Sequence, residues 1–587
     1  MNERKKIENY SFIVIPSAII FVAVALVVLN KTFHFWFSSN DDLLIRSILS
    51  GDYTGSPDGH AVYLLYPLGL LIKSLYKVFP KVTWYELFTI SIHILCVVII
   101  ISVLTVSLAK KAGIYKAERK SVFSLFMILF MATAFEIVFC IDLEFLIASQ
   151  YTALAGLVAA TSFLCLISGN DIPAGVFIVL SLWIRKEVFF MTIPLLVIAV
   201  VYRLMVGYKA GINKDKITKT KKSILFLTVF VICAVSVGVD YAAYSSEEWK
   251  AFKDFNRERT RVYDYALFPN YSEEKDFYDE IGVSQDEYSA LVEYDLALVE
   301  NIDTGILKKM ADRQNAILEE WKQYYNVFHK LVKDAWKFEC ENIKTLHAEF
   351  AIFFLAVSIV ISIISAVKDG KYAGIIAVVL MAGYYVAFIF LFTYLGRLPE
   401  RVIYGLDCMM ILGTLYITIN CPEKMHRYTL EIAATILGLL LIIPFTKAVR
   451  KEFVNLPERI EQREIYESIE SFVGDRPDSI FYIDTNVFEN QIASSEPVYT
   501  EGQSYTYEPV NCIKMTDWVY GSPLRSQKLE RLGTKGLYDK ETDRQGYLII
   551  SDKISTEFIL RLLDEKGFTA IKTDSIESAS VWKLQLK

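Results

Sequence analysis

The chain has 587 residues, of which 53% are hydrophobic and 22% charged, and long apolar stretches recur until about residue 445. This composition excludes an ordinary soluble protein and indicates a polytopic membrane protein. The net charge of -6 offers no basic field for nucleic acid, and the eight cysteines form no Cys-x-x-Cys motif or Cys/His cluster typical of a soft-metal or redox site.

Eleven apolar stretches are predicted to be transmembrane helices, because a helix needs roughly 20 apolar residues to cross the hydrocarbon core. Six of them precede residue 207 and five follow it, and the stretch 172–183 is the shortest. The predicted spans are residues 11–29, 87–108, 121–140, 151–167, 172–183, 188–204, 223–240, 350–367, 372–395, 402–419 and 429–443.

Basic residues in the short connections set the expected orientation. Five lysines and arginines lie between residues 110 and 120, and seven lie between residues 203 and 222. Because basic loops stay in the cytoplasm, these connections and the N-terminus are predicted to be cytoplasmic. The first span lacks a small-residue cleavage pattern, so we expect it to be retained. The loops 31–86 and 244–348 and the C-terminal region are then extracytoplasmic.

The first outer loop opens with Asn40-Asp41-Asp42, two carboxylates just past the first span. Residues 38–50 are predicted to form a short helix that lies on the membrane and ends at Gly51. Its apolar residues Leu44, Ile45, Ile48 and Leu49 share one face, and Asp41, Arg46 and Ser50 point away from it. A second apolar segment, residues 63–79, is expected to lie flat or re-entrant, because a full crossing would put the basic loops on opposite sides.

The carboxylate pair has two interpretations that the sequence leaves open. Ser39-x-x-Asp42 is close to a capping-box pattern, and acidic residues in a first helical turn are favoured by the helix dipole. At the outer surface of a membrane protein, however, a carboxylate can also serve as a general base. His60, in the same loop, is a further candidate, although a lone loop histidine is more often simply solvated.

Other ionisable residues are predicted to lie at outer membrane depth, where they are costly unless they face a cavity. Asp142 and Glu144 follow the third span, and Arg185 lies between the fifth and sixth. Arg397 and Arg401 follow the span 372–395. Arginine offers forked donors to phosphate, but it also anchors helix ends by snorkelling to headgroups, so both roles remain open for these two residues.

The second outer loop and the C-terminal region have different compositions. Residues 244–348 read as an ordered helical cap, with a capping box at Ser284 and Glu287 and with Arg261 in a basic cluster near the lipid phosphates. Residues 450–587 read as a small α/β domain with strands at 479–483, 547–550, 570–573 and 581–586 and a helix at 555–566. Nucleotide-binding and Gly-x-Ser-x-Gly motifs are absent, which argues against an ATP-driven transporter or a hydrolase.

The carboxylate pair after the first span, two amphipathic segments in the first outer loop, eleven spans and an outer C-terminal domain together resemble the GT-C superfamily of polyprenyl-phosphate-dependent glycosyltransferases. The bacterial relatives of protein O-mannosyltransferases and lipid A aminoarabinose transferases are the nearest group. The resemblance covers residues 12–419 and rests mostly on architecture. It implies that Asp41 or Asp42 is a general base or, as in some members, a ligand of a divalent cation such as Mg²⁺ or Mn²⁺.

We therefore expect a GT-C-like membrane domain at residues 1–449 and an extracytoplasmic α/β domain at 450–587. The expected activity is inverting transfer of a sugar from a polyprenyl-phosphate donor to a cell-envelope glycan or lipid, in contact with membrane lipids and without nucleic acid. Asp41 and Asp42 carry the chemistry, and Arg397 and Arg401 bind the donor phosphate. Arg185 and Arg261 are auxiliary donors, and Asp142, Glu144 and His60 are candidate cavity residues.

Two rival interpretations remain. A lipid-linked oligosaccharide flippase or transporter would place charged or Gly-broken helices near the bilayer midplane, where Glu136 and Gly383 are weak hints, but the sequence shows no repeated halves. An envelope assembly protein would use the membrane region only as a scaffold. The second rival does not explain why charges gather on the outer loops.

Overall fold

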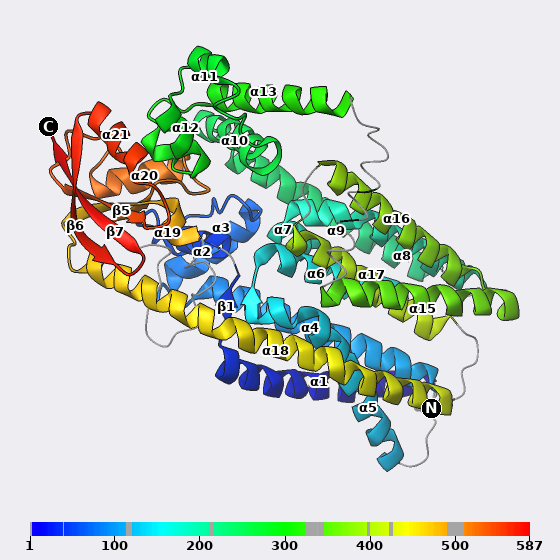
Figure 1. Cartoon of the computed structure of the whole chain (residues 1–587). Helices are drawn as coiled ribbons and strands as arrows, with labels where there is room; N and C mark the ends of the chain where they lie inside the picture. The colour runs from blue at the N-terminus through cyan, green and yellow to red at the C-terminus, as the bar shows by residue number, and fades with distance from the viewer. Residues whose placement is uncertain are drawn as a thin grey trace.

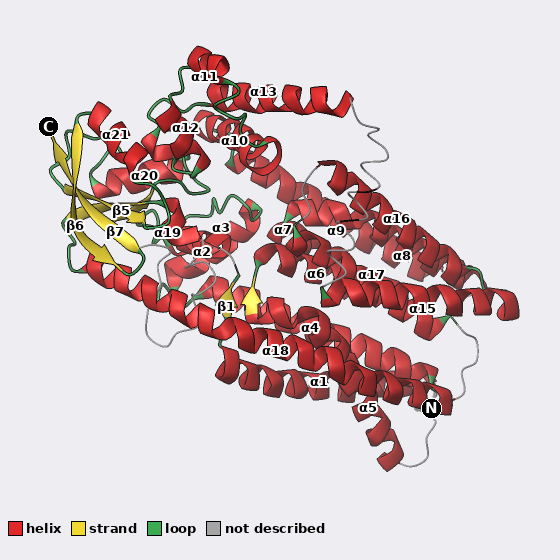
Figure 2. Ribbon diagram, in the orientation of Figure 1, coloured by secondary structure: helices red, strands yellow, loops and turns green. Residues whose placement is uncertain are grey.

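The structure is a computed structural model that describes residues 3–38, 40–112, 120–209, 216–323, 345–395, 399–421, 427–489 and 510–587, with residues 333 and 337. A long helical bundle carries a helical cap and a sheet-containing domain at one end, and the N-terminus lies at the other end (Figure 1). In the described residues, strands occur in the C-terminal domain and in one short pair at the start of the first outer loop (Figure 2).

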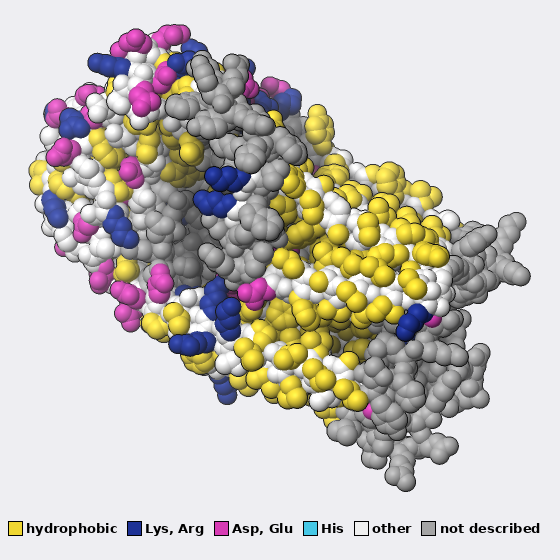
Figure 3. Space-filling model, turned by 45° about the vertical axis from the view of Figure 1, so that its right-hand side comes forward, with side chains coloured by type: hydrophobic (Ala, Val, Ile, Leu, Met, Phe, Trp, Pro, Cys, Tyr) yellow, Lys and Arg dark blue, Asp and Glu magenta, His cyan; other side chains and the backbone are white. Residues whose placement is uncertain are grey.

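The helices of the bundle match the eleven predicted spans. Within the described residues, nine helices are long and apolar enough to cross a membrane. They are α1 (Glu3–Phe33), α4 (Trp84–Lys111), α6 (Tyr151–Ser168), α8 (Lys186–Lys209), α9 (Lys216–Ala243), α15 (Leu346–Asp369), α16 (Ala373–Leu395), α17 (Glu400–Asn420) and α18 (Arg427–Gly474). The other two predicted spans coincide with α5 (Lys120–Ile147) and the shorter α7 (Asp171–Ile184). Hydrophobic side chains dominate the bundle surface, and charged ones gather on the other part of the molecule (Figure 3).

Helices α6 and α17 form the centre of the bundle, since almost all of their side chains are buried. Two glycines bring their backbones together: a Cβ atom added to Gly156 would lie 2.6 Å from the Cα atom of Gly405. Small residues allow such close approach between membrane helices. The contact fixes the first turn of α6, which includes Tyr151, relative to the first turn of α17, which includes Arg401.

The first outer loop is clamped against the bundle. Strand β1 (Trp36–Phe37) pairs in parallel with β2 (Ala148–Ser149), which leads into α6. Helix α2 (Asn40–Ser50) follows, and Gly51, with a φ of +93°, ends it as predicted. The second predicted segment is the short helix α3 (Tyr66–Val78).

Helix α2 differs from the prediction in its surroundings. Every residue from Asp41 to Leu49 is buried, including Arg46 on the predicted polar face. Arg46 lies 3.4 Å from the carboxylate of Glu86 on α4, which compensates its charge. The helix is therefore packed on all sides rather than half-exposed on the membrane.

The cap consists of α10 (Glu247–Thr260), a π-helical turn η3 (Arg261–Ala266), α11 (Lys275–Ile281), α12 (Gln285–Val292), a 3₁₀ turn η4 (Leu296–Leu298) and α13 (Thr304–Gln323). The capping box of Ser284 and Glu287 is confirmed at the start of α12. Buried cap residues such as Leu291 and Met310 share one hydrophobic core with Ile480, Leu548 and other residues of the sheet. The cap and the C-terminal domain are thus a single packed unit.

The C-terminal domain is built on a five-stranded sheet in the order β4-β3-β5-β7-β6. The strands are β3 (Ser479–Ile483), β4 (Cys512–Lys514), β5 (Gln545–Ser551), β6 (Phe568–Ile576) and β7 (Ala579–Leu586), and the helices are α19 (Thr485–Glu489), α20 (Pro523–Leu532) and α21 (Glu557–Glu565). The four predicted strands and the predicted helix are confirmed, whereas the three-residue β4 was not predicted. The expected boundary at residue 450 falls inside the continuous helix α18, whose Tyr466 and Ile469 pack in the core of the domain.

Candidate active site

Asp42 is a buried structural link. Its Oδ1 atom accepts hydrogen bonds from the Tyr85 hydroxyl at 2.7 Å and from the Tyr151 backbone N–H at 3.2 Å, and that N–H lies 3.4 Å from Oδ2. The β1–β2 pairing, continued by a 2.8 Å bond from the Ser38 N–H to the Ser149 carbonyl, brings these groups together. Burial raises the pKa of Asp42 to about 7, and the Tyr85 hydrogen bond lowers it in part. Asp42 therefore ties α2 to α4 and α6.

Asp41, one residue earlier, is in a different environment. Its side chain is buried, and its Oδ1 atom has no hydrogen-bond partner among the residues that the structure describes. The Oδ2 atom lies 4.0 Å from a guanidinium nitrogen of Arg401. Burial raises the pKa of Asp41, whereas the charges of Arg401 and Arg185 lower it. A buried carboxyl with an unused acceptor oxygen and a raised pKa is suited to accept a proton.

Two arginines face the Asp41 carboxyl. Arg185, between α7 and α8, donates to the Tyr151 hydroxyl at 2.5 Å and pairs with Glu187 at 2.9 Å. Its guanidinium lies 5.2 Å from the ring centres of both Tyr63 and Tyr151. The side chains of Arg401 and Arg185 remain 33% and 23% exposed, so an anionic group can reach them. Arg397 lies outside the described residues.

Two other predicted site residues, Arg261 and His60, make their polar contacts with other parts of the protein. Arg261 donates to Glu258 and Asp312, each at 2.6 Å, so its guanidinium is held within the cap. His60 lies with one ring nitrogen 2.6 Å from Asp58 and the other 3.2 Å from the Ala243 carbonyl. The His60 ring also stacks on Trp249, which makes it part of an aromatic cluster that joins the first outer loop to the start of the cap.

Asp142 and Glu144 belong to the last turns of α5 rather than to a loop. Asp142 is buried, with His93 Nε2 at 2.7 Å and a short hydrogen bond from the Tyr404 hydroxyl. Glu144 pairs with Lys451 of α18 at 2.6 Å. These contacts join α4, α5, α17 and α18.

A second buried cluster lies close to Asp142. His347, on α15, is 2.7 Å from Asp407 and 3.3 Å from Glu400, both on α17. The His347 ring packs edge-on against Tyr404 at 5.6 Å. Sequence reasoning did not single out these residues, although ionisable side chains within apolar spans are a recognisable signal.

The C-terminal domain also contributes to the surroundings of Asp41. Trp518 packs against Tyr63 with a ring separation of 5.4 Å, and Tyr63 in turn stacks on Tyr151, whose hydroxyl accepts from Arg185. Arg259 of the cap lies 5.3 Å from the Trp518 ring. No local sequence pattern predicts that Trp518 packs against the first outer loop, because it follows a three-residue strand and is 455 positions from Tyr63.

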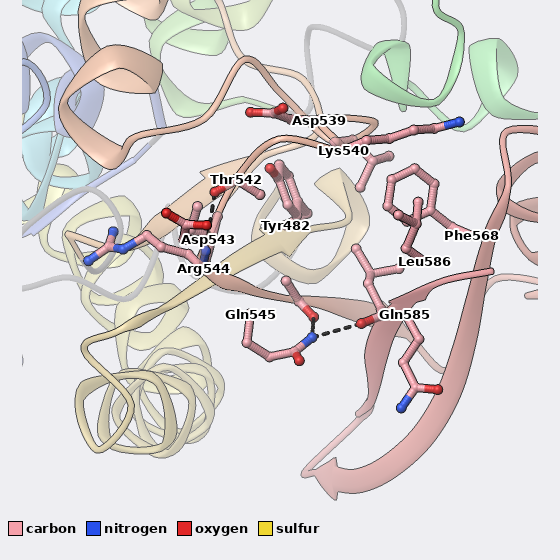
Figure 4. A pocket seen from close by; sticks show the side chains of 14 residues that line it. Tyr482, Asp539, Lys540, Thr542, Asp543, Arg544, Gln545, Phe568, Gln585 and Leu586 are labelled. Atoms are coloured by element: carbon pink, nitrogen blue, oxygen red, sulfur yellow. Dashed lines mark hydrogen bonds between the residues drawn. The ribbon is translucent and has the colours of Figure 1, made fainter.

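Two cavities in the structure are not lined by Asp41. One, of about 320 Å³, lies beside the His347 cluster and is lined by Glu144, Glu400, Lys447 and Lys451 among others. The other, of about 410 Å³, lies in the C-terminal domain. In Figure 4 its Lys540, Arg544 and Gln585 side chains point in three different directions. Polar groups that diverge in this way do not form a convergent binding site.

The side chains around Asp41 do not fit a divalent cation. Such a cation needs several oxygen or nitrogen ligands, and the described residues contain no group of three or more His, Cys, Asp or Glu side chains placed to hold one. Asp42 uses its oxygens on Tyr85 and Tyr151, and two guanidinium groups already face Asp41. We therefore derive no step that depends on a metal.

Comparisons with known proteins gave structural neighbours alone. No family model and no curated protein matches the sequence. The crystal structure of ArnT from Cupriavidus metallidurans bound to undecaprenyl phosphate aligns over 96% of this chain and 97% of that chain, with 12% identity and a TM-score of 0.37. The apo structure of the same enzyme aligns over 97% and 98%, with 12% identity and a TM-score of 0.38. ArnT is an aminoarabinose transferase of the GT-C superfamily that the sequence resembles. Because the TM-scores are low, we assign residue roles from this chain's own geometry.

Proposed function

We propose that this protein is a membrane glycosyltransferase that moves a sugar from a polyprenyl-phosphate donor to a cell-envelope acceptor at the outer membrane surface. The observation that carries the proposal is the Asp41 carboxyl, which is buried, has one oxygen without a hydrogen-bond partner among the described residues, and has its pKa lowered by the nearby charges of Arg401 and Arg185. A base beside fixed positive charge is the combination that transfer from a phosphate leaving group requires.

The proposed reaction is a single displacement. An acceptor hydroxyl oxygen attacks the anomeric carbon, the bond from that carbon to the phosphate oxygen breaks, and polyprenyl phosphate leaves with the bonding electrons. The proton of the hydroxyl passes to Asp41, and Arg401 and Arg185 stabilise the negative charge on the departing phosphate. Attack opposite the leaving group inverts the anomeric carbon.

In this mechanism Asp42 does not exchange protons with substrate. It holds α2 against α4 and α6 through Tyr85 and Tyr151, and so fixes the backbone from which Asp41 projects. The Tyr151 hydroxyl also accepts a hydrogen bond from Arg185, so Tyr151 contacts both Asp42 and the arginine that is proposed to bind the donor phosphate. The two adjacent carboxyls therefore have separate roles.

The experiment that tests the proposal has two parts. Deletion of the gene should cause a polyprenyl-phosphate-linked sugar to accumulate and one envelope glycan or lipid to lose that sugar. The purified protein in liposomes should then transfer labelled sugar from that lipid to an extract of the acceptor. An unchanged lipid pool together with unchanged envelope glycans would refute the transferase.

The flippase alternative is less well supported by the placement of His93, Asp407 and His347, although Glu136 lies near the middle of α5 (Lys120–Ile147). His93 is nine residues from the start of α4 at Trp84, about 14 Å along a helix whose length is about 42 Å. Asp407 is seven residues from the start of α17, and His347 is in the first turn of α15. These groups lie toward the end of the bundle that holds Asp41, whereas transporter sites lie near the midplane.

A further inference from the structure

The cavity of about 320 Å³ beside the His347 cluster is large enough for a small ligand, since ligand pockets begin at about 300 Å³. Its walls come from four helices that meet at one end of the bundle: the last turns of α5, the starts of α15 and α17, and the part of α18 that leads to the C-terminal domain (Figure 1). Protein interiors are close-packed, so helix packing alone does not account for a void of this size.

Six acidic and basic side chains line the cavity, and each of them has a partner of the opposite kind. The pairs, with their closest N–O distances, are Lys451–Glu144 (2.6 Å), His347–Glu400 (3.3 Å), Lys447–Glu349 (3.8 Å) and Glu452–Arg459 (3.0 Å). A charged ligand would have to displace one of these pairs, and the carboxylates would repel a phosphate group. The lining therefore favours an uncharged ligand.

The paired groups still have hydrogen bonds to offer. An ammonium group has three donors and a carboxylate about four acceptor positions, more than one ion pair uses. Lys451 and Glu144 remain 51% and 39% exposed, so a ligand can reach them. Apolar side chains, among them Leu143, Phe145 and Ala448, form other parts of the wall. A sugar ring matches such a lining, because its hydroxyl groups both donate and accept hydrogen bonds and its C–H faces are apolar.

His347 is a fixed part of the cavity wall. Its side chain is buried, its Nδ1 atom lies 2.7 Å from Asp407, and its ring packs edge-on against Tyr404 at 5.6 Å. The Tyr404 hydroxyl in turn donates to the buried Asp142. Ionisable groups at membrane depth are costly and mark functional sites by default. Here they hold one polar group of the wall in a single orientation, as a binding site requires.

The cavity borders an apolar face of α18. Lys447 lines the cavity, and Ile443, Leu440 and Ile436 lie four, seven and eleven positions earlier, on the same face of the helix. All three apolar side chains are exposed. In a membrane-spanning helix such a face contacts the acyl chains of lipids. A molecule whose polar end is in the cavity can therefore keep a lipid tail against α18.

We infer that this cavity binds the sugar headgroup of an uncharged glycolipid whose tail lies along α18, and that this glycolipid is the acceptor. The assignment as acceptor rests on the proposed function. The first turn of α17 connects the two sites, because Glu400 lines the cavity and the next residue, Arg401, lies 4.0 Å from Asp41. The donor phosphate is bound on the Asp41 side of this turn, and the acceptor headgroup reaches Asp41 from the cavity side.

The test uses three variants of the full-length protein. Ala448→Phe fills the cavity from a buried position of its wall. Lys451→Met removes a donor but keeps the apolar stem, and the fold should tolerate it because half-exposed ion pairs contribute little to stability. Ala433→Phe is the matched control, the same substitution at an exposed position of α18. Thermal unfolding is measured for each variant.

Binding is measured by native mass spectrometry after incubation with equal amounts of dihexosyl diacylglycerol, phosphatidylglycerol and phosphatidylethanolamine. The parent and Ala433→Phe should retain the dihexosyl lipid in preference to the other two. Ala448→Phe should weaken its retention by about tenfold or more, because the cavity is filled. Lys451→Met should weaken it about fivefold, the effect of one lost hydrogen bond.

Transfer is measured with a labelled polyprenyl-phosphate sugar and a lipid extract of the envelope. Ala448→Phe should raise KM for the acceptor lipid by about tenfold or more and leave KM for the donor unchanged, because only the acceptor occupies the cavity. Equal increases of both values would contradict an acceptor site.

The outcomes separate this inference from the proposed function. Preferential retention of phosphatidylglycerol or phosphatidylethanolamine, or of none of the three lipids, would overturn the inference, and so would parental binding by a folded Ala448→Phe protein. If Ala448→Phe fails to fold, Lys451→Met decides. If the parent retains the dihexosyl lipid through this cavity but transfers no sugar, the proposed function is wrong and the binding site stands. If the parent transfers sugar only to a water-soluble glycan, the function stands and the inference is wrong.

Discussion

Replacing Asp41 and Asp42, one at a time, by asparagine should separate the proposed catalytic role of Asp41 from the structural role of Asp42. Asp41→Asn removes the negative charge and the base while preserving size. If Asp41 accepts the proton in the transition state, sugar transfer should fall by roughly two to four orders of magnitude. The fold should tolerate the change, since in the described part of the chain the Asp41 Oδ1 atom has no hydrogen-bond partner to lose.

Asp42→Asn should behave in the opposite way. The principal bonds from the Tyr85 hydroxyl and the Tyr151 N–H converge on one oxygen, Oδ1, which an asparagine carbonyl can replace. The new amide group would meet the Tyr151 N–H, now 3.4 Å from Oδ2, at a cost of about 1 kcal/mol. Because burial raises the pKa of Asp42 to about 7, loss of its negative charge should cost less than it would at an exposed carboxylate.

The assay is transfer of labelled sugar from a polyprenyl-phosphate donor by each variant in liposomes, with thermal unfolding measured in the same detergent before reconstitution. We expect Asp41→Asn to unfold at the parental temperature and transfer almost nothing, and Asp42→Asn to keep transfer within about fivefold. Near-normal transfer by Asp41→Asn would refute the base. A folded Asp42→Asn protein as inactive as Asp41→Asn would show that the wrong carboxylate has been assigned.

Three further predictions follow from the same site and its placement. Burial raises the pKa of Asp41 above the usual aspartate value of about 4, and the base must be deprotonated to act, so kcat should fall as the pH is lowered through that raised pKa. A pH–rate profile that stays flat down to about pH 4 would contradict the role of Asp41 as the base. Arg401→Lys should weaken use of the donor more than it lowers the unfolding temperature, because lysine loses the forked geometry, and parental kinetics would favour headgroup anchoring instead. A cysteine at Lys535, whose side chain is 77% exposed, should react with an impermeant thiol reagent in intact cells, while one at Lys214 should not; protection of the Lys535 probe would place the C-terminal domain in the cytoplasm.

Local pattern was sufficient for much of the architecture. The eleven spans, the helix of residues 38–50 with its end at Gly51, the capping box of Ser284 and Glu287, and four strands of the C-terminal sheet all depend on apolar length, periodicity or turn chemistry. These signals extend over a few to about 20 consecutive residues, so they are legible without knowledge of the fold. The same reasoning located the carboxylate pair and Arg401, although it could not assign their partners.

The distinction between Asp41 and Asp42 required the tertiary structure. Neighbouring residues on a helix project about 100° apart, and only the packing of α2 decides that Asp42 meets Tyr85 and Tyr151 while Asp41 meets Arg401. The contact of Trp518 with Tyr63 likewise depends on a sheet whose short strand β4 carries almost no local signal. The amphipathic pattern of α2 predicted a half-exposed helix. Such a pattern shows which face of a helix is polar, but not whether another part of the protein packs on that face. Here the polar face is buried, and Glu86 is the buried partner of Arg46. The sequence by itself determined which segments form helices and strands, because those choices are local, whereas contacts between residues hundreds of positions apart decided which of two adjacent carboxylates is free to act.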